Sequence, residues 1–161
     1  MTQANPTPGL DRNAFLGKAA QDLLHLSSEQ VAVIYARRGL VVPVEVSSTL
    51  LYLSRHENAV LTDISTALDI PHQLAAQRVA KLHKLKLLEK RPDPGDRRRA
   101  YLQLTRAGRE QAQRLDRCMT DMATVYKQLY KEIDCDLPAK LNQAIEALKH
   151  RDLAARFDDN F

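Results

Sequence analysis

The sequence predicts a mainly α-helical protein with one small β-hairpin. Three observations lead to this expectation. Two short helical patterns follow each other closely within residues 62–85, two short strand patterns follow within residues 87–104, and long helical patterns flank this block on both sides. We therefore expect a helix-turn-helix with a hairpin attached, to which the flanking helices add a second layer.

The first short helix is expected from Thr62 to about Leu68, with its buried side at Ile64, Ala67 and Leu68. Thr62 is its predicted N-cap, because a threonine hydroxyl can accept a hydrogen bond from an amide of the first helical turn. The second short helix opens at Pro71, whose fixed φ suits a first turn. Its apolar face keeps helical spacing and comprises Leu74, Ala75, Val79, Leu82 and Leu85.

The other face of the second helix is polar and contains no acid. It comprises Gln73, Gln77, Arg78, Lys81 and Lys84. Glutamine can bind adenine through two hydrogen bonds in the major groove of DNA, and lysine mostly meets phosphate. A solvated surface is generally the commoner explanation for such a face, but a hairpin beside it favours contact with nucleic acid. We therefore expect these five residues to form the recognition helix of a DNA-binding surface.

The hairpin is predicted from strand-like runs at residues 87–91 and 99–104. Between them, Pro94-Gly95 supplies the fixed φ and the permissive residue of a type II turn. The second run alternates, with inward positions expected at Ala100, Leu102 and Leu104. The returning arm is crowded with charge at Asp96, Arg97, Arg98 and Arg99. The hairpin is thus predicted to be a wing, a β-ribbon with arginines at its tip.

Positive charge is concentrated in this part of the chain. Residues 72–114 hold twelve lysines and arginines against four aspartates and glutamates, a balance of +8, whereas the whole chain is +4. Everything else therefore sums to −4. Such segregation is expected of a surface held against phosphates. The alternative is a winged-helix interaction module or scaffold whose basic face binds an acidic protein without sequence-specific DNA binding.

Two local motifs carry a resemblance to a known family. Residues 96–98 read Asp-Arg-Arg in the wing, and residues 104–108 read Leu-Thr-Arg-Ala-Gly at the start of the next helix. With these D-x-R and L-T-x-x-G patterns, residues 40–109 resemble the winged helix of the MarR (multiple-antibiotic-resistance regulator) family of bacterial transcription factors. One departure is visible. Such proteins usually place Gly-Leu after the recognition helix, and this chain has Lys86-Leu87, although lysine adopts a left-handed conformation only at some cost.

The resemblance implies a homodimeric transcriptional regulator, most simply a repressor, that binds a pseudo-palindromic duplex DNA operator. It implies that Arg98 enters the minor groove, that Asp96 braces Arg98 or holds the turn, and that Arg97 and Arg99 meet phosphates or solvent. It also implies a small-molecule effector, for which relatives often use aromatic or phenolic acids, in a pocket where the DNA-binding lobe meets the dimerisation helices. Only loose candidates for lining that pocket can be named: Tyr35, Tyr52, Arg55 and His56.

The long helical patterns define the rest of the predicted organisation. We expect a disordered tail at 1–10, a helical dimerisation region at 11–42 and 105–161, and the winged helix-turn-helix lobe at 43–104. The first helix should end near Arg38-Gly39, since glycine after basic last-turn residues is a common helix stop. A second should run from Pro43 or Glu45 to Arg55, and a final one should begin near Pro138.

From Thr105, a predicted cap, one helical pattern runs without a breaker to about Ile133. Its apolar positions are spaced alternately three and four residues apart, which is a heptad seam. Core packing is the alternative explanation of the seam, but a helix of about 29 residues, or roughly 43 Å, is longer than one lobe can cover. We therefore predict that the seam is a dimer interface. The seam begins at Ala112, and the interface is expected at Leu115, Met119, Met122, Tyr126, Leu129 and Ile133.

Other function classes find little support in the sequence. No apolar run approaches membrane-spanning length, and two cysteines suggest a reducing cytoplasm. Cys118 and Cys135 should lie on one helix about 25 Å apart, too far for a disulfide. Neither the five histidines nor any glycine-rich loop forms a metal-ligand or phosphate-binding pattern, so no metal, cofactor or catalytic activity is expected.

Overall fold

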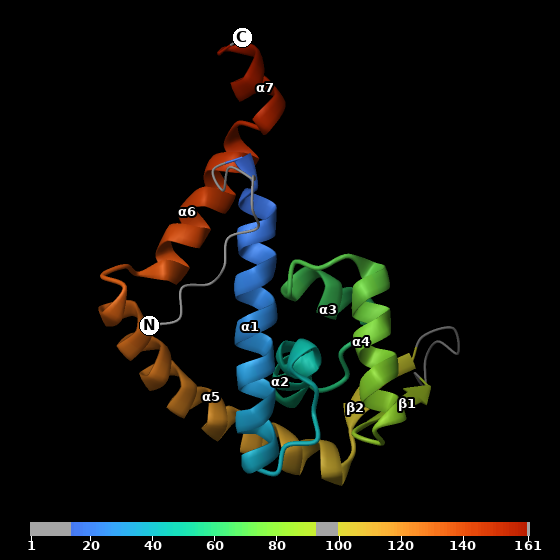
Figure 1. Cartoon of the computed structure of the whole chain (residues 1–161). Coiled ribbons are helices and arrows are strands. Elements are labelled where there is room, and N and C mark those ends of the chain that lie inside the picture. The colour runs from blue at the N-terminus through green and yellow to red at the C-terminus, as the bar shows by residue number, and fades with distance from the viewer. Residues whose placement is uncertain (1–13, 93–99, 161) are drawn as a thin grey trace. The chain divides into compact units, whose positions relative to one another are not determined.

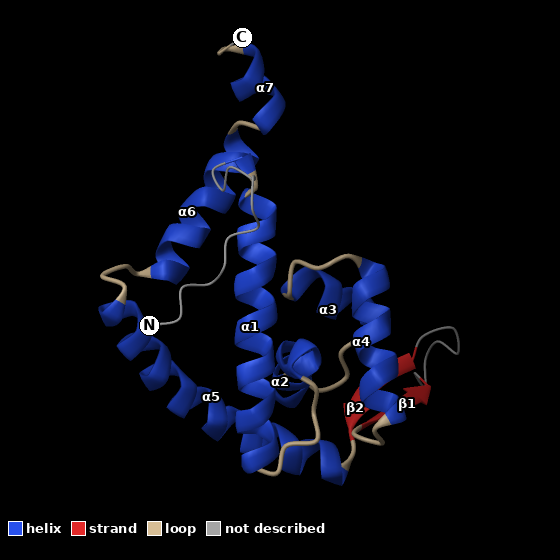
Figure 2. Cartoon of the chain, viewed as in Figure 1, coloured by secondary structure: helices blue, strands red, loops and turns tan. Residues whose placement is uncertain are grey.

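The computed structural model describes residues 14–92 and 100–160. The expected tail at 1–10 and the wing residues Asp96, Arg97, Arg98 and Arg99 lie outside the described residues, as does the Pro94-Gly95 turn. The chain divides into two compact units, Met1–Cys118 and Met119–Phe161. Within the part described, the protein is mainly helical with a two-stranded antiparallel hairpin, which confirms the predicted fold class (Figures 1 and 2).

The first unit holds the predicted winged helix. Its elements in chain order are α1 (Leu16–Arg37), the 3-10 turn η2 (Val44–Val46), α2 (Ser47–Arg55), α3 (Leu61–Ala67), α4 (His72–Lys84), β1 (Leu88–Pro92), β2 (Ala100–Leu104) and the first part of α5 (Arg106–Glu132). The second unit holds the rest of α5, then α6 (Leu137–His150) and α7 (Leu153–Asp158). No helix of the described residues is both long and apolar enough to cross a membrane.

The end of α1 and the start of α2 agree with the sequence prediction. α1 ends at Arg37, and Gly39 follows with φ of 65°. The segment after Pro43 begins as the 3-10 turn and becomes α-helical at Ser47. A hydrogen bond of 2.9 Å between the hydroxyls of Tyr35 and Ser47 joins the two helices inside the core. Aliphatic side chains around it are buried at Val31, Val46, Leu50 and Leu53.

The predicted cap and part of the predicted buried side of α3 are wrong. The helix begins at Leu61 after an N-cap at Val60, so Thr62 lies inside the first turn. The amide of Val60 instead donates to the carboxylate of Asp63 at 2.8 Å. Because an acid at the third helical position satisfies the N-cap amide, a hydroxyl at the cap is not needed. Ile64 is fully buried, whereas Ala67 is exposed.

Helix α4 packs against α3, α2 and β1 in the first unit (Figure 1). Its buried residues are Ala75, Val79 and Leu82, as predicted. Leu74 is 36% exposed, which corrects the prediction that it belongs to this face. It lies about 100° around the helix from its neighbour Ala75, and so at the edge of the buried stripe. Leu85 is half-buried at the C-cap, and Pro71 is the N-cap rather than the first helical residue.

The hairpin pairs Leu88 with Leu104 and ends at the pair formed by Pro92 and Ala100. Leu102 and Leu104 are buried as predicted, but Ala100 is exposed, because it lies at the far end of the ladder from the core. One further backbone contact was not predicted from the sequence. The amide of Leu102 donates to the carbonyl of Ala59 at 2.8 Å, forming an isolated bridge. This bridge fixes the hairpin to the connection between α2 and α3.

The junction between α4, β1 and α5 explains the Leu-Thr-Arg-Ala-Gly motif. The Thr105 hydroxyl accepts from the amide of Gly108 at 3.0 Å, as the predicted cap requires, and donates to the carbonyl of Lys86 at 2.8 Å. A Cβ atom on Gly108 would lie 2.0 Å from the carbonyl oxygen of Leu87, so only glycine fits. Lys86 adopts a left-handed conformation with φ of 58°. Glycine is usual at this position in the family that residues 40–109 resemble.

Helix α5 ends at Glu132, and Asp134 follows with φ of 47°. Cys135 therefore lies beyond the helix, and the expectation that it shares one helix with Cys118 is wrong. Neither cysteine forms a disulfide; Cys118 is buried and Cys135 is half-buried. In the second unit, the carboxylate of Asp136 caps α6 by accepting from the amide of Ala139 at 3.2 Å. No residue of α6 or α7 is buried.

Candidate nucleic-acid interface

The structure places four of the five predicted recognition residues on the exposed face of α4. Gln73, Gln77, Lys81 and Lys84 are all exposed, whereas Arg78 is half-buried. Within the described residues, no hydrogen bond or ion pair engages the side chains of Gln73, Gln77 and Lys84. These three groups are therefore available to a ligand without breaking any described contact.

The other two cations of α4, Arg78 and Lys81, are bound by the start of α2 and by the 3-10 turn η2 before it. Arg78 Nη1 donates to the Ser48 hydroxyl at 3.4 Å, and Arg78 Nε is buried without a hydrogen-bond partner in the described part of the chain. Lys81 forms an ion pair and hydrogen bond with the carboxylate of Glu45. The hydrogen bond from Lys81 is the largest of the effects that lower the pKa of Glu45. The positive charge of Arg78 also lowers this pKa. Sequence reasoning missed this pairing, because Glu45 lies 36 residues before Lys81.

Three arginines at the base of the hairpin and the start of α5 have partners within the chain. Arg91 on β1 pairs with Glu89 on the same strand at 2.8 Å. At the start of α5, Arg106 pairs with Glu110 at 3.1 Å, and Arg109 Nη1 donates to the carbonyl of Leu104 at 2.7 Å. Arg109 is thus hydrogen-bonded to the last residue of β2.

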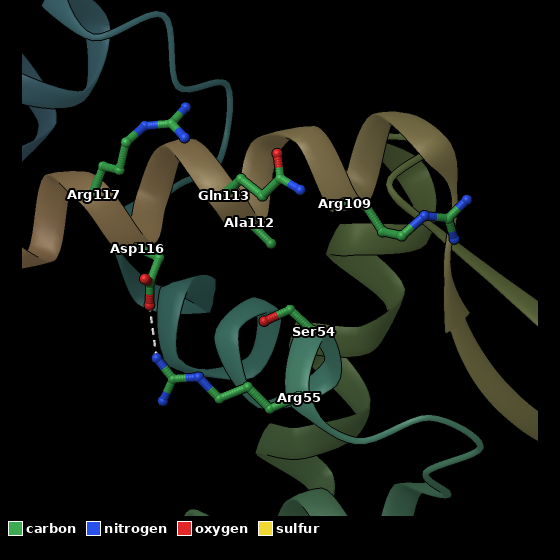
Figure 3. Close-up of a pocket in the computed structure, with 7 residues that line it drawn as sticks. All are labelled: Ser54, Arg55, Arg109, Ala112, Gln113, Asp116 and Arg117. Carbon is green, nitrogen blue, oxygen red and sulfur yellow. Dashed lines mark hydrogen bonds and ion pairs between the residues drawn. The ribbon is translucent and has the colours of Figure 1, made fainter.

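A hollow of about 410 Å³ lies between α2 and the first part of α5 (Figure 3). Its lining residues are Ser54, Arg55, Arg109, Ala112, Gln113, Asp116 and Arg117. Arg55 Nη2 and Asp116 Oδ1 are 2.7 Å apart and bridge the two helices. Figure 3 shows the Asp116 side chain directed toward Arg55, while that of Arg117 extends away from α2.

A smaller hollow of about 160 Å³ shares two of these residues, Ser54 and Arg109, and adds His56 with residues of β2. Of the four loosely predicted pocket residues, Arg55 and His56 therefore line a hollow. Tyr35 and Tyr52 line neither of the two: Tyr35 bonds Ser47 in the core, and the ring of Tyr52 stacks on His56 with centroids 4.2 Å apart. Asp116 and Gln113 were missed, because nothing in a helical pattern distinguishes a pocket-lining polar residue from a solvated one.

The predicted seam on α5 divides into a buried and an exposed part. Leu115 is fully buried and Met122 is 6% exposed, while Met119 and Tyr126 are half-buried. Leu129 and Ile133 are 37% and 46% exposed. Leu115 is therefore covered already in a single chain, whereas the end of the seam is not. No group of three or more potential metal ligands occurs among the described residues.

Comparison with known proteins finds a family match for part of the chain. Residues 37–99, which include α2, α3, α4 and β1, match the model of the MarR family. This segment belongs to the MarR family. No curated protein matches the chain.

Several solved structures share the fold. CouR, a transcriptional repressor bound to a 23-mer DNA duplex, is 21% identical with a TM-score of 0.63, over 85% of this chain and 94% of its own. S. aureus MepR in complex with DNA is 22% identical with a TM-score of 0.62, over 84% and 97%. A MarR transcriptional regulator from Methanosarcina mazei Go1 is 18% identical with a TM-score of 0.58, over 88% and 98%. At such identities these likenesses establish the fold, and they extend it beyond the MarR segment to the flanking helices.

Proposed function

We propose that the protein is a homodimeric MarR-type transcriptional repressor that binds a pseudo-palindromic duplex DNA operator and releases it when a small effector binds. The observation that carries the proposal is the exposed face of α4. Gln73, Gln77 and Lys84 project from it with no described partner, and α4 contains no acidic residue. Amide side chains can read base edges and ammonium groups bind phosphate, so this face has the chemistry of a major-groove reader. The relatives CouR and MepR have been solved with DNA.

The dimer is proposed from apolar surface that the single chain leaves uncovered. On α6, Leu141, Ile145 and Leu148 are 44%, 48% and 37% exposed, although their spacing places them on one helix face. Leu129 and Ile133 add to this surface from the end of α5. Clustered apolar groups of this kind usually mark an interface between proteins. A second copy of the chain would supply a surface of the same composition.

The effector site is proposed at the hollow between α2 and α5. Its volume of about 410 Å³ suits a small organic molecule. Arg55 offers a guanidinium that a carboxylate could bind through two hydrogen bonds, in competition with Asp116. An aromatic or phenolic acid would thus break the Arg55–Asp116 bridge between α2 and α5 and bind Arg55 in its place. Because α2 supports α4, a change in this bridge can favour a dimer with wrongly spaced recognition helices and so lower operator affinity.

Selection of bound sequences from a pool of random duplex DNA tests the proposal. We expect recovery of an inverted repeat, because a symmetric dimer presents two identical reading helices. Recovery of unrelated sequences despite measurable retention would favour an electrostatic interaction module. Absence of retention at low salt would exclude the DNA-binding function. Addition of aromatic acids to the selected complex then tests the effector, with Arg55→Gln as the variant expected to lose the response and Arg117→Gln as a control in the same hollow.

A further inference from the structure

The recognition helix is acid-free in sequence, yet an acid from another element reaches it. Glu45 lies in the 3-10 turn before α2, and its carboxylate pairs with Lys81 on α4. Ser48, one turn further along, accepts from Arg78. The 3-10 turn η2 and the start of α2 therefore bind Lys81 and Arg78, while Lys84 on the same helix has no described partner.

This pair is poorly placed to stabilise the fold. The side chains of Glu45 and Lys81 are 55% and 47% exposed, and ion pairs at such exposure contribute little to stability because water screens them. Glu45 could also serve as an acid near the start of α2, where the helix dipole favours negative charge. That role requires no partner on α4, however, and does not explain why the carboxylate is turned toward Lys81.

The pair has a direct consequence for DNA binding. Lys81 lies on the face that the proposed function assigns to the major groove and its flanking phosphates. A carboxylate on Lys81 occupies the position that a phosphate oxygen would take, and it repels the polyanion as a whole. A duplex must therefore displace Glu45 before Lys81 can bind phosphate.

We propose that Glu45 is a built-in competitor for the DNA phosphates that Lys81 would bind, and so sets the affinity and the salt dependence of the interface. This inference rests on the proposed function. When Lys81 is transferred from Glu45 to DNA, the freed carboxylate takes up a cation from solution. That uptake cancels part of the ion release on binding. Removing the carboxylate should strengthen binding and make it more sensitive to salt.

The test uses the full-length protein and fluorescently labelled duplexes, one carrying the selected operator and one of unrelated sequence. Binding is measured over a series of salt concentrations for the unmodified chain and for Glu45→Gln. We expect binding about fivefold tighter per subunit, which is the Coulomb energy of about 1 kcal/mol between two unit charges about 4 Å apart in water. The log–log salt slope should become more negative by about 0.9 per subunit, or about 2 for a dimer. Both duplexes should respond, because the competition does not depend on base sequence.

Three further variants separate competition from general electrostatics and from folding. Glu146→Gln removes an equal charge from a similarly exposed pair with Lys149 on α6, outside the MarR segment, and should leave the slope unchanged. In a Lys81→Gln background, the effect of Glu45→Gln should shrink. Glu45→Ala should reproduce Glu45→Gln. A purely structural role for Glu45 would change the melting temperature and leave the slope where it was.

The outcomes are distinguishable. If the unmodified protein binds its operator and Glu45→Gln either weakens binding or changes neither affinity nor slope, the competition is overturned and the DNA-binding function stands. If neither protein retains duplex DNA at low salt, the proposed function itself is overturned, and the competition with it.

Discussion

Helices α4 and α6 have the same apolar spacing and opposite environments. On α4 the positions are Ala75, Val79 and Leu82, and on α6 they are Leu141, Ile145 and Leu148, each set separated by four and then three residues. The first set is at most 5% exposed, whereas the second is at least 37% exposed. An amphipathic pattern thus predicts that a helix needs a neighbour, and it does not say whether the same chain supplies it.

The difference separates the two kinds of surface in this protein. The α4 set is covered by other elements of the first unit, so it belongs to the core that positions the reading face. The α6 set remains exposed to solvent in the folded chain, as do Leu129 and Ile133 on α5. We attribute it to a second copy of the chain. Three sets of substitutions follow, in order of decreasing expected effect.

The largest effect is expected from a charge on α6. Ile145→Glu should dissociate the dimer into folded monomers, because a carboxylate buried at an interface without a partner costs about 3–5 kcal/mol. Sedimentation equilibrium at micromolar protein gives the mass, and circular dichroism gives the helix content. Gln143→Glu, at an exposed polar position of the same helix, is the control and should remain dimeric. A monomeric unmodified protein at these concentrations would refute the attribution to a second copy.

A matched pair of leucine truncations should give the next largest effect. Leu82→Ala empties a fully buried position and should lower the free energy of unfolding by about 2–5 kcal/mol at any protein concentration. Leu148→Ala should cost less, and its cost should depend on concentration, because its cover comes from association. Urea unfolding at two protein concentrations a hundredfold apart distinguishes the two. An equal, concentration-independent loss in both variants would mean that α6 is covered by its own chain.

The smallest effect is expected at the C-terminal ends of α4 and α5. A left-handed residue follows each helix, Lys86 after α4 and Asp134 after α5. The amide of the next residue then donates to a carbonyl of the last helical turns: Leu87 to Leu82 at 3.1 Å, and Cys135 to Tyr130 at 3.0 Å. Lys86→Gly should raise the free energy of unfolding by about 1 kcal/mol, since glycine removes the strain at positive φ. Asp134→Gly should gain less, because aspartate tolerates this conformation better. A loss of stability in Lys86→Gly would show that the lysine side chain itself supports the junction.

The sequence predicted those features that depend on periodicity and on local backbone rules. The buried residues of α4, the end of α1 at Gly39 and the cap at Thr105 all follow from residues near one another in the chain. The cap of α3 was misassigned because Thr62 and Asp63 are adjacent and either can satisfy a free amide. Leu74 was misassigned because a hydrophobic residue at the edge of a stripe resembles one inside it.

The features that sequence reasoning missed are contacts between distant residues. The Lys81–Glu45 pair, the Arg55–Asp116 bridge and the contact of Leu102 with Ala59 each join residues more than thirty positions apart. No local pattern distinguishes such partners from solvated neighbours, since each residue is ordinary in its own helix or strand. The polar chemistry of the candidate site was therefore predictable by residue type, and its internal pairing was not.

The spacing of the two half-sites tests the central claim, a DNA-binding dimer, most directly. Two recognition helices held by one interface should enter successive major grooves, with half-site centres about 10 base pairs apart. Inserting about five base pairs between the half-sites of the selected operator turns one of them to the opposite face of the duplex. We predict that binding then falls to the level of unrelated DNA. An affinity unchanged by this insertion would contradict the operator-binding dimer.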